Sequence, residues 1–292
     1  MKKIICLTIL IWIALNSNPT LHAQIIRTYA MDQPDFIILD QNISKKEILD
    51  TSYLNLIYKL DFKGDEAGTR LYDEMCLQTG ALYTKFYSRN MHINDSICTE
   101  QSKVQLQVPV ADPAWQKYEI YCNIQEKKIT VTQRVPFTQA VYQYEEPAPE
   151  IHWTLKAGMD TIMGYPCSEA TTELFGRKYT AWYSLEIPAP YGPWKFSGLP
   201  GLILQIADER GDYIFTCIGI NQHSVPIVRY DWKYRNVSKK EWMSFEKKMY
   251  EYAGQFVKNS GQNVIIMDNS EQGYHLLPEG WEAYYNPIEL SK

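Results

Sequence analysis

Residues 202–220, LILQIADERGDYIFTCIGI, decide the fold class of this 292-residue chain. Two runs rich in isoleucine, leucine, phenylalanine and tyrosine flank the polar segment Asp208–Asp212, which contains Gly211. Branched and aromatic residues favour strands, and a short polar segment with a glycine favours a turn. The stretch therefore predicts a β-hairpin.

The same kind of pattern recurs along the chain. Residues 167–184 predict a second hairpin with Gly176 at its tip, and residues 122–131 predict two strands about a polar turn. Partial alternation of apolar and polar residues predicts further strands at 52–62, 103–108 and 128–135. A period of two dominates, so we expect a mainly β (α+β) protein built on a curved antiparallel sheet or half-barrel.

One long helix is predicted over residues 238–258. Ser238 and Glu241 form a capping-box pattern, and Val237 and Trp242 stand at the two hydrophobic-staple positions. Apolar residues then follow at steps of three and four: Trp242, Phe245, Met249, Ala253 and Phe256. We expect this stripe to pack on one face of the sheet, the alternative being a membrane or partner surface. A second capping-box pattern predicts a short helix at 43–50.

The first 23 residues have the layout of a secretory signal peptide. Two lysines precede an apolar run over residues 4–15, and Ala23 offers a small residue for cleavage. This run is shorter than the about 20 apolar residues that span a bilayer, and no later stretch is longer and as apolar. We expect cleavage near Ala23, which leaves one β-rich domain, residues 24–292, in the periplasm or associated with the envelope.

The charge of the mature chain excludes one class of partner. Residues 1–23 contain two lysines and no acidic residue, so their removal leaves 27 basic and 34 acidic residues, a net charge of −7. The basic residues form no block. Because phosphate backbones are bound by clustered lysine and arginine, nucleic acid is not an expected partner.

Five cysteines remain after cleavage, namely Cys76, Cys98, Cys122, Cys167 and Cys217. An oxidising compartment permits disulfides, but an odd number leaves at least one thiol unpaired within the chain. We expect several of them to be small buried residues and allow one or two bridges. Neither the cysteines nor the scattered histidines have the spacing of a metal site, so the sequence predicts no metal.

The glycine-rich segment Gly198–Ile203, GLPGLI, invites comparison with a phosphate-binding loop. Such a loop needs a Lys-Ser or Lys-Thr pair after its last glycine and a helix behind it. Here Gly201 is followed by LILQI, which favours a strand, so the sequence excludes this interpretation. Pro200 and Gly201 instead match the central positions of a type II turn, in which the glycine takes positive φ. We expect this turn to lead into a strand at 202–207.

Blocks of sequence around this segment resemble the GLPGLI family of exported Bacteroidota proteins. The motif itself is Gly198, Leu199, Pro200, Gly201, Leu202 and Ile203. The resemblance extends over GYPCSEA (164–170), GRKYTAWYS (176–184), EIP (186–188) and GPWKFSGLPGLIL (192–204), with YSRN (87–90) and YYNPIEL (284–290) farther away. It implies an exported protein of largely antiparallel β structure. It implies no reaction, because the family has no agreed activity.

Aromatic and basic residues next to the motif are the candidate ligand-binding residues. They are Arg177, Tyr179, Trp182, Tyr183, Tyr191, Trp194, Lys195 and Phe196. Aromatic rings with a polar end suit sugar faces, peptides and protein interfaces, and the two cations add charge-assisted contacts. The alternative interpretation is that the rings belong to the core of a large β protein.

No pattern of a catalytic residue stands out. The chain lacks a Gly-x-Ser-x-Gly elbow and a His-Glu-x-x-His helix, and Glu145 and Glu146 are neighbours that point to opposite faces of a strand. The sequence therefore favours a non-catalytic role, with no cofactor, in binding a hydrophobic or aromatic ligand, a peptide or an outer-membrane protein. A hydrolase of glycans or peptides and an envelope assembly factor are the alternatives.

Two short patterns predict modification. Asp95–Ile97 and Asp160–Ile162 resemble the Asp-Ser/Thr-aliphatic sites at which exported Bacteroidota proteins are O-glycosylated, which points to Ser96 and Thr161.

Overall fold

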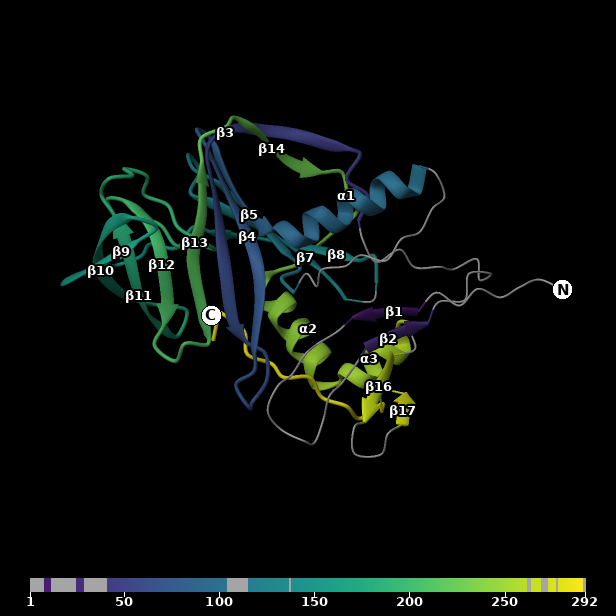
Figure 1. Ribbon diagram of the computed structural model, residues 1–292. Coiled ribbons are helices and arrows are strands. Elements are labelled where there is room, and N and C mark those ends of the chain that lie inside the picture. Colours follow the sequence, from purple (N-terminus) through teal and green to yellow (C-terminus); the bar gives the residue numbers. More distant parts are fainter. Residues whose placement is uncertain are drawn as a thin grey trace.

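The computed structural model describes residues 8–11, 25–28, 41–103, 115–136, 138–261, 264–268, 273–276 and 278–290. Its main element is an open, mixed sheet of 13 strands (Figure 1). In spatial order, twelve of them are β15 (Tyr234–Asn236), β8 (Val141–Pro147), β7 (Lys128–Arg134), β6 (Tyr118–Asn123), β5 (Tyr83–Ser88), β4 (Arg70–Gly80), β3 (Lys46–Lys63), β13 (Tyr213–Asn221), β12 (Leu202–Asp208), β11 (Arg177–Ser184), β10 (Tyr165–Leu174) and β9 (Thr154–Ile162). The prediction of a mainly β protein is confirmed.

The pairing within this sheet is antiparallel, except that β15 runs parallel to β8. The remaining strand, β14 (Val225–Tyr230), pairs with the first half of β3. Two hairpins that the sequence predicts are present: β10 and β11 turn at Phe175 and Gly176, and β12 and β13 turn at 209–212. Phe175, Gly176 and Gly211 have positive φ, as tight hairpin turns require.

Side-chain contacts show that the large sheet is bent. The rings of Phe86 on β5 and Phe215 on β13 lie 6.2 Å apart, although these strands are three positions apart in the sheet. Three strand spacings in a flat sheet would amount to about 14 Å. Glu146 on β8 also pairs with Lys195, which precedes β12, although six strands lie between β8 and β12. The sheet therefore curves so that one of its faces is concave, and we call this the inner face.

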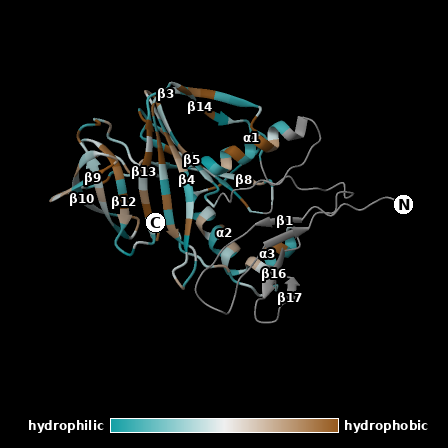
Figure 2. Cartoon of the chain, viewed as in Figure 1, coloured by the Kyte–Doolittle hydropathy of each residue, from teal (hydrophilic) through white to brown (hydrophobic). Residues whose placement is uncertain are grey.

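The inner face carries the core. Alternate residues of the strands are buried, and Figure 2 shows hydrophobic and hydrophilic residues in turn along the strands. On β11, Tyr179, Ala181 and Tyr183 are buried, whereas Thr180 and Trp182 on the opposite face are half-buried. The expected period of two is thus present where the sequence places it.

The described helices follow two strands of the large sheet, one helix after β5 and two after β15. α1 (Arg89–Lys103) was not predicted; it begins after Ser88, whose hydroxyl accepts a hydrogen bond from the Met91 amide at 3.1 Å. α2 (Lys239–Glu251) begins with the predicted capping box of Ser238 and Glu241. α3 (Ala253–Asn259) follows directly after Tyr252, whose φ of −120° ends α2. The predicted single helix over 238–258 is therefore two shorter helices.

α2 lies beside β8 (Figure 1). Trp242 is buried, and its ring lies 5.6 Å from that of Tyr142 on β8 and 5.7 Å from that of Phe245. Val237, at the other staple position, is half-buried against the same core. The first turns of the helix are therefore held by aromatic packing as well as by the capping box.

The predicted short helix at 43–50 is wrong. β3 begins at Lys46, because this stretch pairs with β14 from Lys46 opposite Tyr230 to Ser52 opposite Val225. Ser44 donates its hydroxyl proton to Asn42 Oδ1 and caps no helix. A local capping pattern has been overridden by a partner strand about 180 residues away in the sequence, as happens to weak propensities.

Of the predicted strand at 103–108, only its first residue is described. Lys103 is the last residue of α1, and residues 104–108 lie outside the described residues.

The turn at the GLPGLI segment differs from the expected type II turn. Positive φ is found at Gly198 (94°) and at Trp194 (56°) but not at Gly201. Gly201 is buried, and a side chain there would overlap the carbonyl oxygen of Ser184, so close backbone approach is what demands glycine. The predicted strand does begin at Leu202, as β12.

A second, four-stranded sheet joins β1 (Thr8–Ile11), β2 (Ile25–Thr28), β16 (Val264–Asp268) and β17 (Gly273–Leu276). β1 falls within the predicted signal peptide, and cleavage near Ala23 would remove it and leave β2. The cleavage stays a prediction. Among the described helices, none combines the length and the apolarity that a membrane crossing needs.

Replacement of Gly201 by alanine should lower the free energy of unfolding by about 1–3 kcal/mol, because the added methyl group forces the Ser184 carbonyl away. Urea denaturation measures this change. Gly280→Ala is the matched control, since a methyl group there meets no atom within 4 Å. Equal stability of the two variants would contradict the close approach.

Candidate ligand-binding cavity

The structure places most of the predicted ligand-binding residues in the interior. Six are buried and two are half-buried; the buried ones are Arg177, Tyr179, Tyr183, Trp194, Lys195 and Phe196, and the half-buried ones are Trp182 and Tyr191. The rings of Tyr179 and Phe196 lie 4.7 Å apart, edge to face, and Trp194 lies 5.2 Å from Phe196. Several of these aromatics are therefore core, as the alternative interpretation had it.

Arg177 binds the chain itself. Its Nη1 donates to Asp208 Oδ2 and Asp212 Oδ2, each at 2.9 Å, and its Nη2 donates to Asn286 Oδ1 at 2.6 Å and to the Pro287 carbonyl at 2.8 Å. Burial tends to raise the pKa of the Asp212 carboxyl, but the hydrogen bond and charge of Arg177 outweigh it and hold this pKa below its ordinary value. Arg177 thus fastens residues 286–287 to the β12–β13 turn.

Lys195 takes part in a second buried network. Its ammonium group pairs with Glu146 and with Glu289, and the same two carboxylates pair with Lys239 at 2.7 and 2.5 Å. Two positive and two negative groups are therefore matched. They join β8, the loop before β12, the start of α2 and the C-terminal segment. The side chain of Glu146 is 9% exposed.

Residues 281–289 run across the inner face of the sheet. The Tyr213 hydroxyl donates to the Asn286 carbonyl, at 2.5 Å, and the Leu290 amide donates to the Phe175 carbonyl at 2.9 Å. Figure 1 shows this segment in yellow, passing α2 and ending beside the strands. We call residues 281–289 the C-terminal strap. It is held by Arg177, Lys195 and Tyr213, two of which the sequence had assigned to ligand binding.

Beneath the strap lies a cavity of about 550 Å³. It is lined by residues of β3, β4, β6, β7, β8, β13, α2 and the strap, it is partly open to solvent, and rings form much of its wall. The aromatic residues that line it are Phe62, Trp115, Tyr118, Tyr144, Trp194, Tyr213, Trp242, Tyr250, Trp281, Tyr284 and Tyr285. Of the predicted ligand-binding residues, Trp194 and Lys195 line this cavity.

A buried carboxylate holds one wall in place. Asp73 on β4 accepts hydrogen bonds from the amides of Trp115 and Gln116 at 3.0 and 2.8 Å, and from the Ser88 hydroxyl at 3.0 Å. Burial raises the pKa of Asp73 to about 6 despite these donors. Asp73 therefore positions the segment that brings Gln116 to the cavity and, through Ser88, the start of α1.

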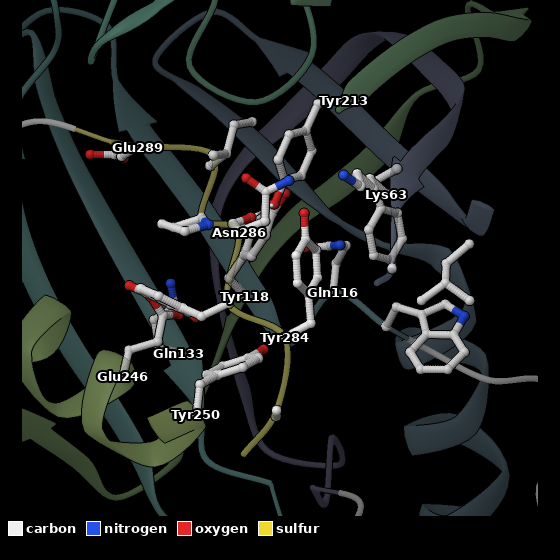
Figure 3. Close-up of a pocket in the computed structure, with 18 of the residues that line it drawn as sticks. Lys63, Gln116, Tyr118, Gln133, Tyr213, Glu246, Tyr250, Tyr284, Asn286 and Glu289 are labelled. Carbon is white, nitrogen blue, oxygen red and sulfur yellow. Dashed lines mark hydrogen bonds between the residues drawn. The ribbon is translucent and has the colours of Figure 1, made fainter. Parts of the chain in front are cut away.

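Glu246 on α2 also lines this cavity, and unlike Glu289 it forms no ion pair with a described residue. Its Oε2 accepts a hydrogen bond from the Tyr285 hydroxyl at 3.2 Å, and no described cation lies within ion-pair distance of it. Burial raises the pKa of Glu246 to about 7, against the hydrogen bond from Tyr285. In Figure 3, Glu246 and Tyr250 enter the cavity from α2, and Lys63 lies on the opposite side.

Sequence reasoning missed most of this cavity. Gln133 and Tyr213 come from predicted strands, but a single sequence does not reveal which face of a strand lines a cavity, and Tyr118, at the start of β6, lies outside the predicted strands. Two signals were present for the rest: the helical stripe that includes Trp242, and the YYNPIEL block that supplies the strap.

The GLPGLI motif is a structural element in this arrangement. Leu199, Leu202 and Ile203 are at most 1% exposed, and the Ile203 carbonyl accepts a hydrogen bond from the Tyr58 hydroxyl on β3 at 2.7 Å. Gly198 and Pro200 are exposed at the surface. The motif packs the loop before β12 against the middle of the sheet.

The thiols and the predicted glycosylation sites lie elsewhere. Cys76, Cys98, Cys122, Cys167 and Cys217 form no disulfide bonds among the described residues, and Cys167 and Cys217 are buried. Within the described part of the chain, no group of histidine, cysteine and acidic residues has the arrangement of a metal site. Ser96 and Thr161 are exposed, so both are accessible to modification.

A family model described as "Protein of unknown function (Porph_ging)" matches residues 175–205. The match spans β11 and the GLPGLI segment, and it is consistent with the resemblance drawn from the sequence. No curated protein matches the chain.

Two solved structures of PNGF-II, in different crystal forms, are similar in part. Each has 10% sequence identity and a TM-score of 0.48. The likeness covers 67% and 69% of this chain but 32% and 33% of the PNGF-II chains. The protein described here thus spans about a third of the length of PNGF-II, and these values carry no information on its activity.

Replacement of Arg177 by alanine should destabilise the fold by about 3–5 kcal/mol, because it leaves the buried Asp208 and Asp212 without their cation. Urea denaturation measures the loss, and hydrogen exchange should become faster at 284–290. Lys178→Ala, at an exposed position of the same strand, is the control. A loss of less than about 1 kcal/mol for the Arg177 variant would show that the strap does not depend on this arginine.

Glu246→Gln should change how stability depends on pH. The folded pKa of about 7 lies above the ordinary 4.5, so the folded protein binds this proton more tightly than the unfolded chain does. That contribution is complete below about pH 4.5 and is lost as the pH rises through 7. Between these limits the wild type should lose about 3 kcal/mol relative to the glutamine variant.

Urea denaturation at a series of pH values tests this expectation. Glu251→Gln, on the same helix at an exposed position, should show a difference from the wild type that does not vary with pH. Parallel stability curves for the wild type and Glu246→Gln would mean that Glu246 does not titrate near neutral pH.

Proposed function

We propose that the protein is an exported member of the GLPGLI family and binds a small ligand in the cavity under the strap, without catalysing a reaction. The cavity carries this proposal. Its volume of about 550 Å³ lies within the range of about 300–1,000 Å³ that ligand pockets occupy, and rings with a few polar groups line it. In this proposal the bent sheet acts as a half-barrel, and the protein resides in the periplasm or at the envelope.

The charges in the cavity favour binding over hydrolysis. Acid–base catalysis by carboxyl groups uses two of them with separate roles, held about 5–10 Å apart. Of the two glutamates that line the cavity, Glu289 pairs with Lys195 and Lys239. Asp65, the third carboxyl group of the lining, has both of its oxygens occupied by hydrogen bonds from the amide and hydroxyl of Thr69.

The alternative role as an assembly factor needs an exposed apolar surface. Leu155 and Met159 on the edge strand β9 are 60% and 80% exposed, and Met163 in the following turn is 44% exposed. This edge is small, and a register shift between β9 and β10 disturbs it, as is common where sheets avoid further pairing. The cavity is therefore the better supported site.

Native mass spectrometry of the protein isolated from its own cells tests the proposal. A small molecule that is retained under native conditions and released on denaturation is the expected result. Tyr250→Ala should lower its occupancy, because this ring lines the cavity, whereas Tyr252→Ala should not, because Tyr252 is exposed at the end of the same helix.

An unliganded mass accompanied by a co-purifying membrane protein would favour the assembly role and contradict the proposal. Equal occupancy in the Tyr250 and Tyr252 variants would place the ligand outside the cavity. The N-terminal residue of the isolated protein, read in the same experiment, tests cleavage near Ala23.

A further inference from the structure

Glu246 and Lys63 are the two charged groups of the cavity lining that stay apart from the other charges. Lys195, Lys239, Glu146 and Glu289 neutralise one another, and Asp65 accepts hydrogen bonds from the amide and hydroxyl of Thr69. Lys63 lies on the side of the cavity opposite Glu246 (Figure 3), with its ammonium group 5.7 Å from the centre of the Tyr284 ring. The described contacts of Glu246 come from neutral groups such as the Tyr285 hydroxyl. When this carboxyl group ionises, its end of the cavity becomes negative.

Aromatic rings surround the same end. Tyr250 and Tyr285 are in contact, with ring centroids 5.1 Å apart, and Trp242 lies one helical turn before Glu246 on α2. All three line the cavity together with Glu246. The faces of such rings attract cations, and more strongly where water is excluded.

Two tyrosine hydroxyl groups that line the cavity already donate hydrogen bonds within the protein. Tyr285 donates to Glu246, and Tyr213 donates to the carbonyl of Asn286. What these two residues offer a ligand is thus their π faces, beside the carboxylate. A neutral polar ligand would gain little from this arrangement, and an anionic one would be repelled.

We propose that the Glu246 end of the cavity binds a positively charged nitrogen of the ligand, held between the carboxylate and the rings of Trp242, Tyr250 and Tyr285. The inference rests on the proposed function, because it assumes that the cavity is the ligand site. An ammonium group fills only a small part of about 550 Å³, so it forms one end of a larger molecule.

Binding should depend on pH through Glu246. The other titratable groups that face it are Tyr144, Tyr213, Tyr250, Tyr285 and Glu289. Burial raises the pKa of each of these tyrosines above its ordinary value, to about 12 for Tyr250, so they stay neutral. Glu289 is held by two lysines. Deprotonation of Glu246 with rising pH should therefore strengthen the binding of a cation.

Choline and its neutral carbon isostere, 3,3-dimethyl-1-butanol, separate charge from shape. Titration of the full chain, followed by protein amide chemical shifts, should show choline binding about tenfold more tightly than the isostere. The preference should be larger at about pH 8 than at about pH 6. Glu246→Gln should abolish it and Glu251→Gln should keep it, with melting temperatures confirming that both variants are folded.

Equal affinity for the two probes, or a preference that survives in Glu246→Gln, would overturn the inference. So would the binding of neither probe. The proposed function would still stand in that case if the ligand released in mass spectrometry were neutral or anionic and lost occupancy in Tyr250→Ala. It would fail separately if the protein carried no cavity ligand at all.

Discussion

Four charged side chains, each less than 20% exposed, hold the C-terminal strap against the inner face of the sheet, and the strap forms one wall of the cavity. Lys195 and Lys239 each contact both Glu146 and Glu289. Glu146 lies on β8 and Lys195 precedes β12, and six strands separate β8 from β12 in the order of the sheet. This network therefore also fixes how strongly the sheet bends. Arg177 also holds the strap, through hydrogen bonds to the Asn286 side chain and the Pro287 carbonyl. Buried ion pairs add little net stability, but they are costly to break and therefore select one arrangement.

The interior of the protein contains a packed hydrophobic core and a cavity. Near the GLPGLI segment, Leu199, Phe196 and Tyr179 are at most 2% exposed and pack together. Toward α2 the rings line the cavity. The strap takes part in both regions, because Ile288 packs against the core and lines the cavity together with Tyr284 and Tyr285.

The sequence was informative where structure is local. The hairpins at Gly176 and Gly211, the strand after Gly201 and the capping box of Ser238 all depend on neighbours in sequence, and all are present. It failed where distant partners decide: residues 46–50 pair with β14, and Glu146 meets Lys195 across the sheet. For the same reason Arg177 and Lys195 were predicted to bind a ligand, and their partners within the chain were not foreseen. Gly201 was assigned to the right segment for a different physical reason, close approach in place of positive φ.

The position of the strap in the chain sets an order on assembly. A chain is synthesised from its N-terminus, and residues 281–289 emerge after every strand of the large sheet. Until then Lys195, Lys239 and Glu146 lack the carboxylate of Glu289, and the space beneath the strap is open to water. The cavity therefore lacks one of its walls through most of the chain's synthesis. A chain that stops short of these residues would contain every strand of the large sheet and still lack that wall.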